Sequence, residues 1–184
     1  LQARLALVQA LAKAAEPGQR AVLVARAAAV AERTILGPRQ WAGDPETELY
    51  EVQSGDVLEN IGLRYRIPYE LVKRVNGLSS DMIRVGQKLK VVKGPFRARV
   101  VKGAYRLELW LRDTPVKIFP VAIGANDSSP SGSYVVGVKQ KQPVFYPPPS
   151  LQGKMGVKAA GAPDNPLGTR WIGLGDHLGI HGTN

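Results

Sequence analysis

The spacing of apolar residues changes along this chain, and that change limits the possible folds more than any other feature of the sequence. Residues 1–36 repeat apolar side chains at helical spacing, which predicts amphipathic helices. From Pro95 onward, short alternating runs are separated by turn residues, which predicts antiparallel strands. Residues 50–92 combine both patterns. A chain of 184 residues has room for one or two domains and small modules, so we expect an α+β multidomain protein.

The first segment, residues 1–37, is predicted to form a helical hairpin. Pro17-Gly18 separates its two helical runs, and Gly37-Pro38 ends the second. Residues 38–48 are then expected to be a linker. The hairpin is either half of a helical repeat that binds a partner or a spacer that has lost its packing neighbours. A single hairpin cannot cover its own apolar face, which favours the spacer.

The second segment, residues 49–93, has the clearest pattern, with the predicted order strand, helix, helix, strand. Asp56 and Glu59 have the spacing of a capping box, which predicts the start of a helix. Pro68 suits the first turn of a second helix, and Asn76-Gly77 suits its left-handed end. We therefore expect a small module with both helices packed on a two-stranded sheet.

The third segment, residues 95–184, is predicted to be a mainly antiparallel β domain. Its expected strands cover residues 97–102, 105–111, 116–122, 133–138 and 171–174. Gly124 to Gly132 is expected to form a polar turn region, and the remaining sequence is rich in glycine.

Composition excludes several kinds of site. The chain has no cysteine, which excludes disulfides, thiolate zinc sites and iron–sulfur clusters within it. It has two histidines, which excludes a metal site built from histidine alone. No run of about 20 apolar residues is present, so no transmembrane segment is expected.

The formal net charge of +10 predicts attraction to polyanions or to an anionic surface such as a cell envelope. In the third segment, basic residues alternate with apolar ones, which is typical of solvated strand faces. Neither a recognition-helix motif nor an aromatic RNA-binding platform accompanies the charge, so we expect no nucleic-acid partner.

Residues 49–93 resemble the LysM (lysin motif) module in more than ten positions. The matching residues are Tyr50, Val52, Gly55, Asp56, Leu58, Ile61, Tyr65, Ile67, Leu71, Asn76, Ile83, Gly86, Gln87 and Leu89. The resemblance implies binding of N-acetylglucosamine-containing glycans such as peptidoglycan in a shallow groove between two loops. Mapped onto this chain, the glycan-binding residues would be Gly55, Asp56, Val57, Leu58, Leu78, Ser79, Met82 and Ile83.

Residues 95–184 resemble the N-terminal portion of an L,D-transpeptidase (YkuD-like) catalytic domain. The resemblance depends on three segments: Ser129-Pro130-Ser131-Gly132, Asn165 to Trp171, and Ile180-His181-Gly182-Thr183. It implies a β-sandwich-like fold whose histidine pairs with a cysteine further along the chain. That cysteine motif is absent from this sequence, so we expect the chain to be truncated before it and to be inactive alone.

The resemblance assigns His181 as the base that removes the thiol proton and suggests the main-chain carbonyl of Gly182 as its partner. Gly179 and Gly182 are expected to allow close approach of the backbone to substrate. Trp171 is expected in the core, Arg170 as a donor that ties down the turn at Asn165, and His177 as an exposed loop side chain.

Together these resemblances imply a bacterial cell-wall enzyme located in the envelope. It would bind peptidoglycan and transfer a tetrapeptide-stem acyl group through a cysteine thioester, without any metal or organic cofactor. The alternative is a non-catalytic peptidoglycan-binding scaffold, in which the β domain only presents a surface.

Overall fold

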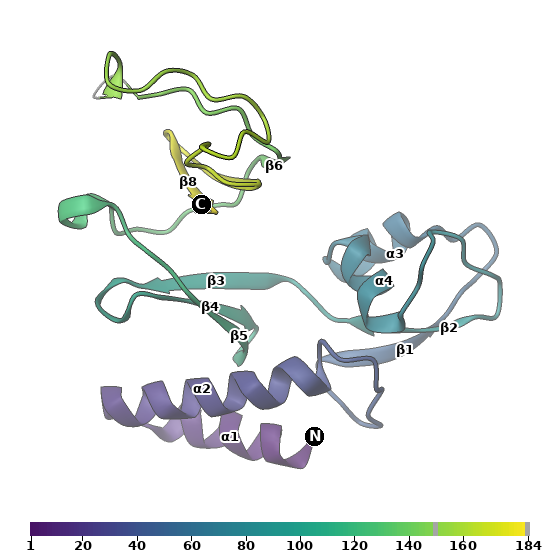
Figure 1. The fold of residues 1–184 in the computed structure, drawn as a ribbon. Helices are drawn as coiled ribbons and strands as arrows, with labels where there is room; N and C mark the ends of the chain where they lie inside the picture. The colour runs from purple at the N-terminus through teal and green to yellow at the C-terminus, as the bar shows by residue number, and fades with distance from the viewer. Residues whose placement is uncertain (149–150, 183–184) are drawn as a thin grey trace. The chain divides into compact units, whose positions relative to one another are not determined.

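The computed structural model describes residues 1–148 and 151–182, which form four α-helices and three antiparallel sheets, as expected for an α+β protein (Figure 1). Contacts within the chain divide it into two compact units, Leu1–Ser128 and Ser129–Asn184. This division falls inside the range 95–184, and the domain boundaries expected above stay predictions. No helix in the described part is long and apolar enough to cross a membrane.

The first unit begins with two antiparallel helices, α1 (Gln2–Lys13) and α2 (Pro17–Thr34). Helix α2 packs against strand β5 (Thr114–Pro120) (Figure 1). Leu11 and Val24 are buried in one cluster with Trp110. The hairpin therefore has packing neighbours, and the interpretation of it as a spacer without them is wrong. Its apolar face is covered by a sheet that lies far away in the sequence.

The module that follows contains β1 (Thr47–Glu51), α3 (Leu58–Tyr65), α4 (Tyr69–Asn76) and β2 (Lys88–Val92). Strands β1 and β2 are antiparallel, with Tyr50 opposite Leu89. Both helices end on a left-handed residue, Arg66 after α3 and Gly77 after α4. The predicted order of elements is therefore observed.

The two helices and the sheet of this module enclose its apolar core. The buried side chains are Val52, Leu58, Ile61, Ile67, Leu71, Val72, Val75, Leu89, Val91 and Val92. The same cluster continues to Ile35 at the end of α2 and to Leu111 and Val116 in the next sheet. The module is thus one part of a larger core.

The predicted capping box does not form. Helix α3 begins after Val57, and no side chain caps it. The carboxylate of Asp56 instead accepts hydrogen bonds from the Gln53 amide at 2.8 Å and the Tyr50 hydroxyl at 2.5 Å. Asp56 thus stabilises the turn before the helix, because the amide of Gln53 competes with those of the helix for the same acceptor.

Three of the predicted strands form one sheet with the order β3-β4-β5. They are β3 (Phe96–Val101), β4 (Arg106–Leu111) and β5. Two short 3₁₀ turns, η1 (Lys102–Ala104) and η2 (Ala125–Asp127), follow β3 and β5.

The second unit contains a sheet with the order β6-β7-β8, formed by β6 (Lys139–Lys141), β7 (Arg170–Gly175) and β8 (Leu178–His181). The strand predicted over residues 133–138 is absent, and Val135 is 85% exposed. Valine favours a strand only where its side chain can pack, and none of these side chains is buried. Strand β8 was not predicted, and the two-residue turn Asp176-His177, with both φ angles positive, pairs it with β7.

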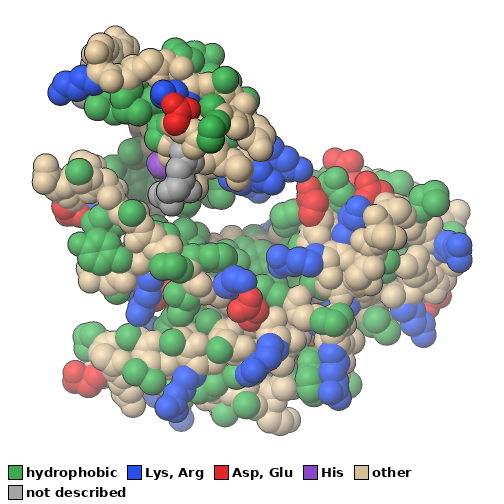
Figure 2. Space-filling model, viewed as in Figure 1, with side chains coloured by type: hydrophobic (Ala, Val, Ile, Leu, Met, Phe, Trp, Pro, Cys, Tyr) green, Lys and Arg blue, Asp and Glu red, His purple; other side chains and the backbone are tan. Residues whose placement is uncertain are grey.

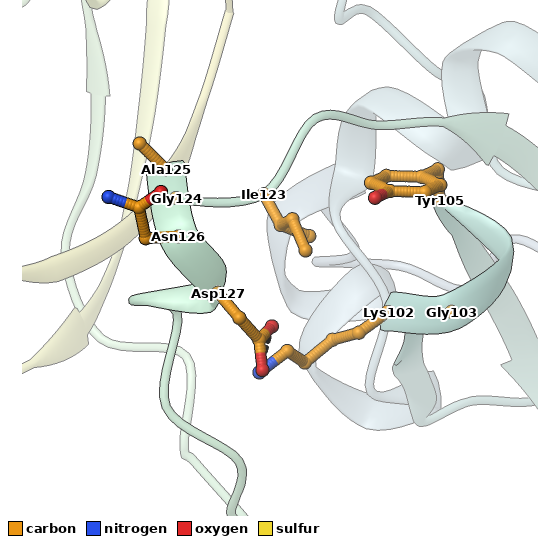
Figure 3. Close-up of a pocket in the computed structure, with 8 residues that line it drawn as sticks. All are labelled: Lys102, Gly103, Tyr105, Ile123, Gly124, Ala125, Asn126 and Asp127. Carbon is orange, nitrogen blue, oxygen red and sulfur yellow. Dashed lines mark ion pairs between the residues drawn. The ribbon is translucent and has the colours of Figure 1, made fainter.

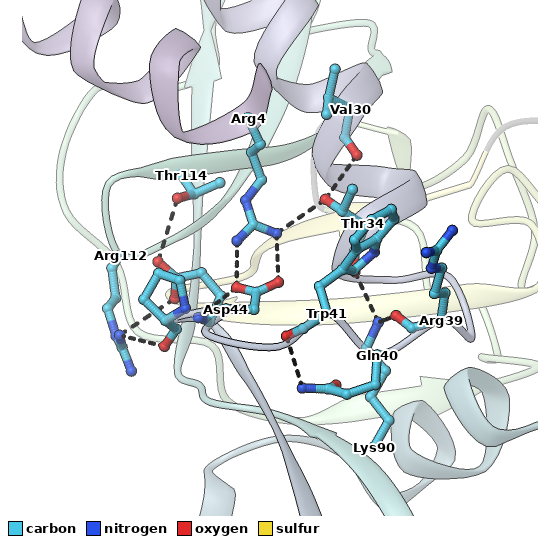
Figure 4. A network of polar contacts seen from close by, with 12 residues as sticks. Arg4, Val30, Thr34, Arg39, Gln40, Trp41, Asp44, Lys90, Arg112 and Thr114 are labelled. Atoms are coloured by element: carbon cyan, nitrogen blue, oxygen red, sulfur yellow. Dashed lines mark hydrogen bonds and ion pairs between the residues drawn. The ribbon is translucent and has the colours of Figure 1, made fainter. Parts of the chain in front are cut away.

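A buried ion pair joins the first helix to the segment expected to be a linker (Figure 4). The guanidinium of Arg4 donates to both carboxylate oxygens of Asp44 and to the hydroxyl of Thr34, and the side chains of the ion pair are fully buried. Asp44 also accepts the Glu46 amide at 2.9 Å. Burial raises the pKa of Glu46, which lies beside Arg112. This stretch is therefore packed against the rest of the unit.

Lys90 joins strand β2 to the end of helix α2. Its ammonium group donates to the carbonyls of Thr34 at 2.9 Å, Gly37 at 2.7 Å and Arg39 at 2.8 Å. An ammonium has three protons, so all three are used. Burial lowers the pKa of Lys90 to about 8. One side chain thus caps the helix and fixes the module against the hairpin.

Candidate functional site

His181 lies at the end of strand β8, opposite Trp171 of strand β7. The imidazole stacks on the indole, with ring centroids 5.8 Å apart and an angle of 16° between the planes. His181 is exposed to solvent, whereas Trp171 is half-buried rather than in the core as expected. The indole therefore supports one face of the imidazole and leaves its edge accessible.

The imidazole Nδ1 of His181 lies 2.6 Å from the carbonyl oxygen of Gly182, the contact that the sequence suggested. A carbonyl oxygen can only accept, so Nδ1 must hold the proton in this contact. In the neutral ring, Nε2 then has a free lone pair. The geometry leaves His181 able to accept a proton at Nε2.

Gly179 is required by the indole of Trp171. A Cβ on Gly179 would lie 2.3 Å from the Trp171 ring, whereas a Cβ on Gly182 would make only ordinary contacts, the nearest at 3.6 Å. Close approach of a substrate was the expected reason for both glycines. For Gly179 the structure gives another reason: the absence of a side chain leaves room for the indole of Trp171, which stacks on His181.

Asn165 organises the long loop before strand β7. Its amide donates to the carbonyls of Pro143 at 2.8 Å and Ala159 at 3.1 Å, and its oxygen accepts the Leu167 amide at 2.9 Å. The expectation that Arg170 would stabilise this turn is wrong, because Arg170 is exposed and donates to its neighbour Thr169.

The turn of the β7–β8 hairpin contains His177, which lies outside the histidine motif of residues 180–183. His177 is an exposed turn residue, as expected. Thr183, the last residue of the motif, lies outside the described residues.

Seven of the eight residues expected to bind glycan lie on two loops, one between β1 and α3 and the other between α4 and β2, and the eighth, Leu58, is the first residue of α3. Backbone hydrogen bonds between Val52 and the pair Gly86 and Gln87, at 2.8 and 2.9 Å, join the bases of these loops. The structure thus anchors both loops at the same end of the small sheet.

These eight residues differ in what they can offer to a ligand. Gly55, Val57, Ser79 and Met82 are exposed, and Met82 is 85% exposed. Leu58 is buried, and Leu78 and Ile83 pack against the core. The exposed members can contact a ligand directly, whereas the buried members shape the loops.

A polar cluster of Tyr50, Asp56 and Arg64 holds the first of these loops. The Tyr50 hydroxyl donates to Asp56 and accepts from Arg64 at 2.6 Å, and Arg64 also pairs with Asp56 at 3.5 Å. The hydrogen bond from Tyr50, with that from the Gln53 amide, lowers the pKa of Asp56. Sequence reasoning missed Arg64, because only the fold brings α3 beside β1.

A separate hollow of about 600 Å³ lies between η1 and η2 in the first unit (Figure 3). Lys102 and Asp127 form an ion pair there at 2.6 Å, and Tyr105 and Ile123 line it. No residue of this hollow was among the candidate site residues of the sequence, and Lys102 and Asp127 already pair with each other.

Figure 2 shows that the basic side chains visible on each unit are dispersed and do not form one patch. The positive charge therefore acts over a broad surface, which suits long-range attraction to an extended polyanion.

Comparison with known families identifies both parts of the chain. Residues 50–92 match the LysM domain, and residues 95–184 match the L,D-transpeptidase catalytic domain. The chain therefore contains a LysM domain followed by an L,D-transpeptidase catalytic domain.

Three proteins that are similar to this chain are named as L,D-transpeptidases. The chain is 28% identical over 146 residues to the L,D-transpeptidase YkuD of Bacillus licheniformis, covering 74% of this chain and 76% of that protein. It is 27% identical over 144 residues to YkuD of Bacillus subtilis strain 168, covering 73% and 75%. It is 40% identical over 74 residues to the L,D-transpeptidase YqjB of the same strain, covering 36% and 38%.

Proposed function

We propose that this protein is a peptidoglycan L,D-transpeptidase of the cell envelope in which His181 is the general base. The observation that supports this role is the contact between Nδ1 of His181 and the carbonyl of Gly182. With the proton held at Nδ1, Nε2 is the atom that can take a proton from a nucleophile.

The proposed reaction has two steps. A cysteine thiol gives its proton to Nε2 of His181, and the sulfur attacks the carbonyl before the terminal D-alanine of a tetrapeptide stem. The C–N bond breaks, the amine of D-alanine leaves with the proton, and a thioester remains. An acceptor amine then attacks the thioester, loses a proton to the imidazole and releases the thiol.

The thiol must come from outside these 184 residues, which contain no cysteine. A thiolate is the reacting form, and an unperturbed thiol has a pKa of about 8.5, so a nearby base is needed at neutral pH. We therefore expect the 184-residue polypeptide to perform no transpeptidation alone.

The LysM domain is proposed to bind the glycan strands of peptidoglycan through the two loops between β1 and α3 and between α4 and β2. Support comes from the exposed side chains of Val57 on the first loop and Met82 on the second, and from the exposed position of Gly55 on the first loop. Apolar side chains can pack on a sugar face while backbone groups pair with its acetamido group. Such tethering raises the local concentration of stem peptides near the catalytic domain.

Sedimentation with purified sacculi tests the binding proposal. Met82→Ser should lower the apparent affinity for sacculi about tenfold, so that a smaller fraction of the protein sediments. The substitution removes an exposed apolar contact and leaves the core unchanged. Leu63→Ser is the matched control, since Leu63 is 71% exposed on α3 and lies outside both loops. Equal sedimentation of both variants and the parent would refute the proposed groove.

Two measurements test the catalytic proposal. Nitrogen-15 NMR of the neutral imidazole of His181 should show the proton on Nδ1 and a free Nε2. A tetrapeptide substrate mixed with an amine acceptor should give no product with this polypeptide. The Nε2–H tautomer would contradict the assigned base, and turnover would contradict the thiol mechanism.

A non-catalytic peptidoglycan-binding scaffold is the second candidate, favoured by the lack of cysteine in the sequence. A thiol-reactive substrate analogue distinguishes the two when applied to the protein purified from its native host. Labelling that is lost in His181→Gln supports the enzyme, and absence of labelling supports the scaffold.

A further inference from the structure

A second cleft in the first unit lies between helix α1 and strands β3 and β4. Its volume is about 640 Å³. Val8, Leu11 and Ala12 form an apolar wall from α1, and Arg97, Arg99 and Trp110 line it from the sheet. None of these residues belongs to the LysM loops or to the histidine site.

The floor of this cleft is fixed by a buried charge. Trp110 is 7% exposed, and its indole N–H donates to a carboxylate oxygen of Glu108 at 3.1 Å. Glu108 is itself buried and pairs with Arg106 at 2.7 Å. The indole therefore has a defined orientation, and the negative charge beneath it is already matched by Arg106.

Arg97 and Arg99 remain available to a ligand. They are two residues apart on β3, so their side chains lie on the same face of the sheet about 7 Å apart along the strand. Arg97 lies 5.7 Å from the centre of the Trp110 ring, and its only ion pair in the described structure is an exposed one with Asp113 at 3.5 Å. Such exposed pairs are weak and can be exchanged.

Arg99 is opposite Glu108 in the strand register, yet Glu108 pairs with Arg106. Within the part of the chain that the structure describes, the side chain of Arg99 has no hydrogen bond or ion pair, although its backbone pairs with β4. The nearby Arg20 adds further positive charge while it donates to two carbonyls at the end of α1. The cleft thus joins an apolar wall to an unmatched guanidinium.

We propose that this cleft binds a short peptide with small side chains and a free C-terminal carboxylate. Arg99 would pair with the carboxylate in a bidentate arrangement, with Arg97 beside it, and methyl groups would pack against Val8 and Ala12. An apolar wall next to the anion site favours such a peptide over a bare phosphate chain. This inference rests on the proposed function, under which stem peptides ending in D-alanine are the peptides of this kind.

Methyl and indole NMR signals of the 184-residue protein test the proposal, with acetyl-tetra-alanine as the probe and its C-terminal amide as the matched comparison. The acid should shift the signals of Val8, Ala12 and Trp110 in a saturable way. The amide should bind about tenfold more weakly, because it lacks the charge that pairs with arginine.

Two variants sharpen the test. Arg99→Gln should weaken binding of the acid about tenfold, whereas Arg26→Gln, which removes an exposed charge on α2 outside the cleft, should not. Equal binding of acid and amide, unchanged binding by Arg99→Gln, or equal binding of inorganic phosphate would each overturn the proposal.

Failure of this inference is distinguishable from failure of the proposed function. Met82→Ser should leave the shifts caused by acetyl-tetra-alanine unchanged, because Met82 lies outside the cleft. Met82→Ser should also lower sedimentation with sacculi when Arg99 is already replaced by glutamine. Altered acetyl-tetra-alanine shifts in Met82→Ser would contradict the separation of the two sites.

Discussion

Different kinds of contact stabilise the LysM domain and the unit Ser129–Asn184, each within itself. Residues 50–92 bury ten apolar side chains in a cluster shared with the helical hairpin and the β3-β4-β5 sheet. Among the described residues of the second unit, Phe145 is the one large apolar residue whose side chain is buried. That unit depends on turns, on two hairpin strands and on the amide of Asn165. Similar lengths of chain thus derive their order from a core in one case and from polar contacts in the other.

The largest effect is expected at the buried ion pair of the first unit. Arg4→Ala should lower the free energy of unfolding by about 4 kcal/mol, because it leaves the buried carboxylate of Asp44 without its partner. Urea denaturation followed by circular dichroism at 222 nm measures this, since all described α-helices lie in the first unit. The double variant Arg4→Met with Asp44→Leu should recover at least half of the loss. No recovery would mean that Arg4 acts mainly by packing.

A pair of isoleucines compares the two units directly. Ile61→Ala should cost about 3 kcal/mol, because Ile61 is fully buried. Ile172→Ala, at a partly exposed position in β7, should cost less than about 1 kcal/mol. The same denaturation experiment measures the first, and protection of β7 amides from hydrogen exchange measures the second. Equal costs would contradict the difference between the units.

The pH dependence of the free energy of unfolding tests the lowered pKa of Lys90. The pKa of Lys90 is depressed by burial to about 8, from 10.5 in the unfolded chain. The unfolded state therefore binds more protons between these values, so the contribution of Lys90 to stability should rise as pH increases from about 8 to about 10.5. The expected gain is about 3 kcal/mol. The free energy of unfolding in urea, measured for the parent and for Lys90→Met at each pH, isolates this contribution as their difference. A difference that does not change with pH would contradict the depressed pKa of Lys90.

A smaller and local effect is expected in the second unit. Asn165→Ala should destabilise the loop of residues 143–169 by about 1.5 kcal/mol, because the carbonyls of Pro143 and Ala159 lose their donor. Faster hydrogen exchange at the amides of Phe145 and Leu167 reports this. Helical signal at 222 nm should not change, and a global loss of stability would show that the two units unfold together.

The smallest change in stability is expected at Gly179. Gly179→Ala should move the indole of Trp171 away from His181, which NMR detects as a loss of the ring-current shift on the imidazole protons. Gly182→Ala is the matched control, because the space around Gly182 accepts a methyl group. An unchanged shift in Gly179→Ala would contradict the stacking.

The sequence predicted residues 50–92 well because local signals agree there. Helical spacing, Pro68 and Gly77 all indicate elements that the core then stabilises. Asp56 was assigned a wrong partner, because a carboxylate can accept from a turn amide as readily as from a helix amide. Single polar side chains are therefore less predictable than the elements around them.

Contacts between elements that are far apart in the chain could not be predicted from the sequence. Nothing in the local pattern indicated that α2 would cover β5, or that Lys90 would cap α2 from 51 to 56 residues away. For the candidate site, the partner of His181 was suggested correctly from the resemblance, whereas its stacking on Trp171 depends on a register set by the turn at Asp176 and His177.

The three bonds of Lys90 also have a mechanical consequence. They restrict rotation of the LysM domain against the helical hairpin, because strand β2 is hydrogen-bonded to carbonyls at and just after the end of helix α2. A force applied at the proposed glycan-binding loops would therefore be transmitted to the hairpin, and the LysM domain would keep a fixed distance from the β3-β4-β5 sheet instead of moving as on a flexible linker.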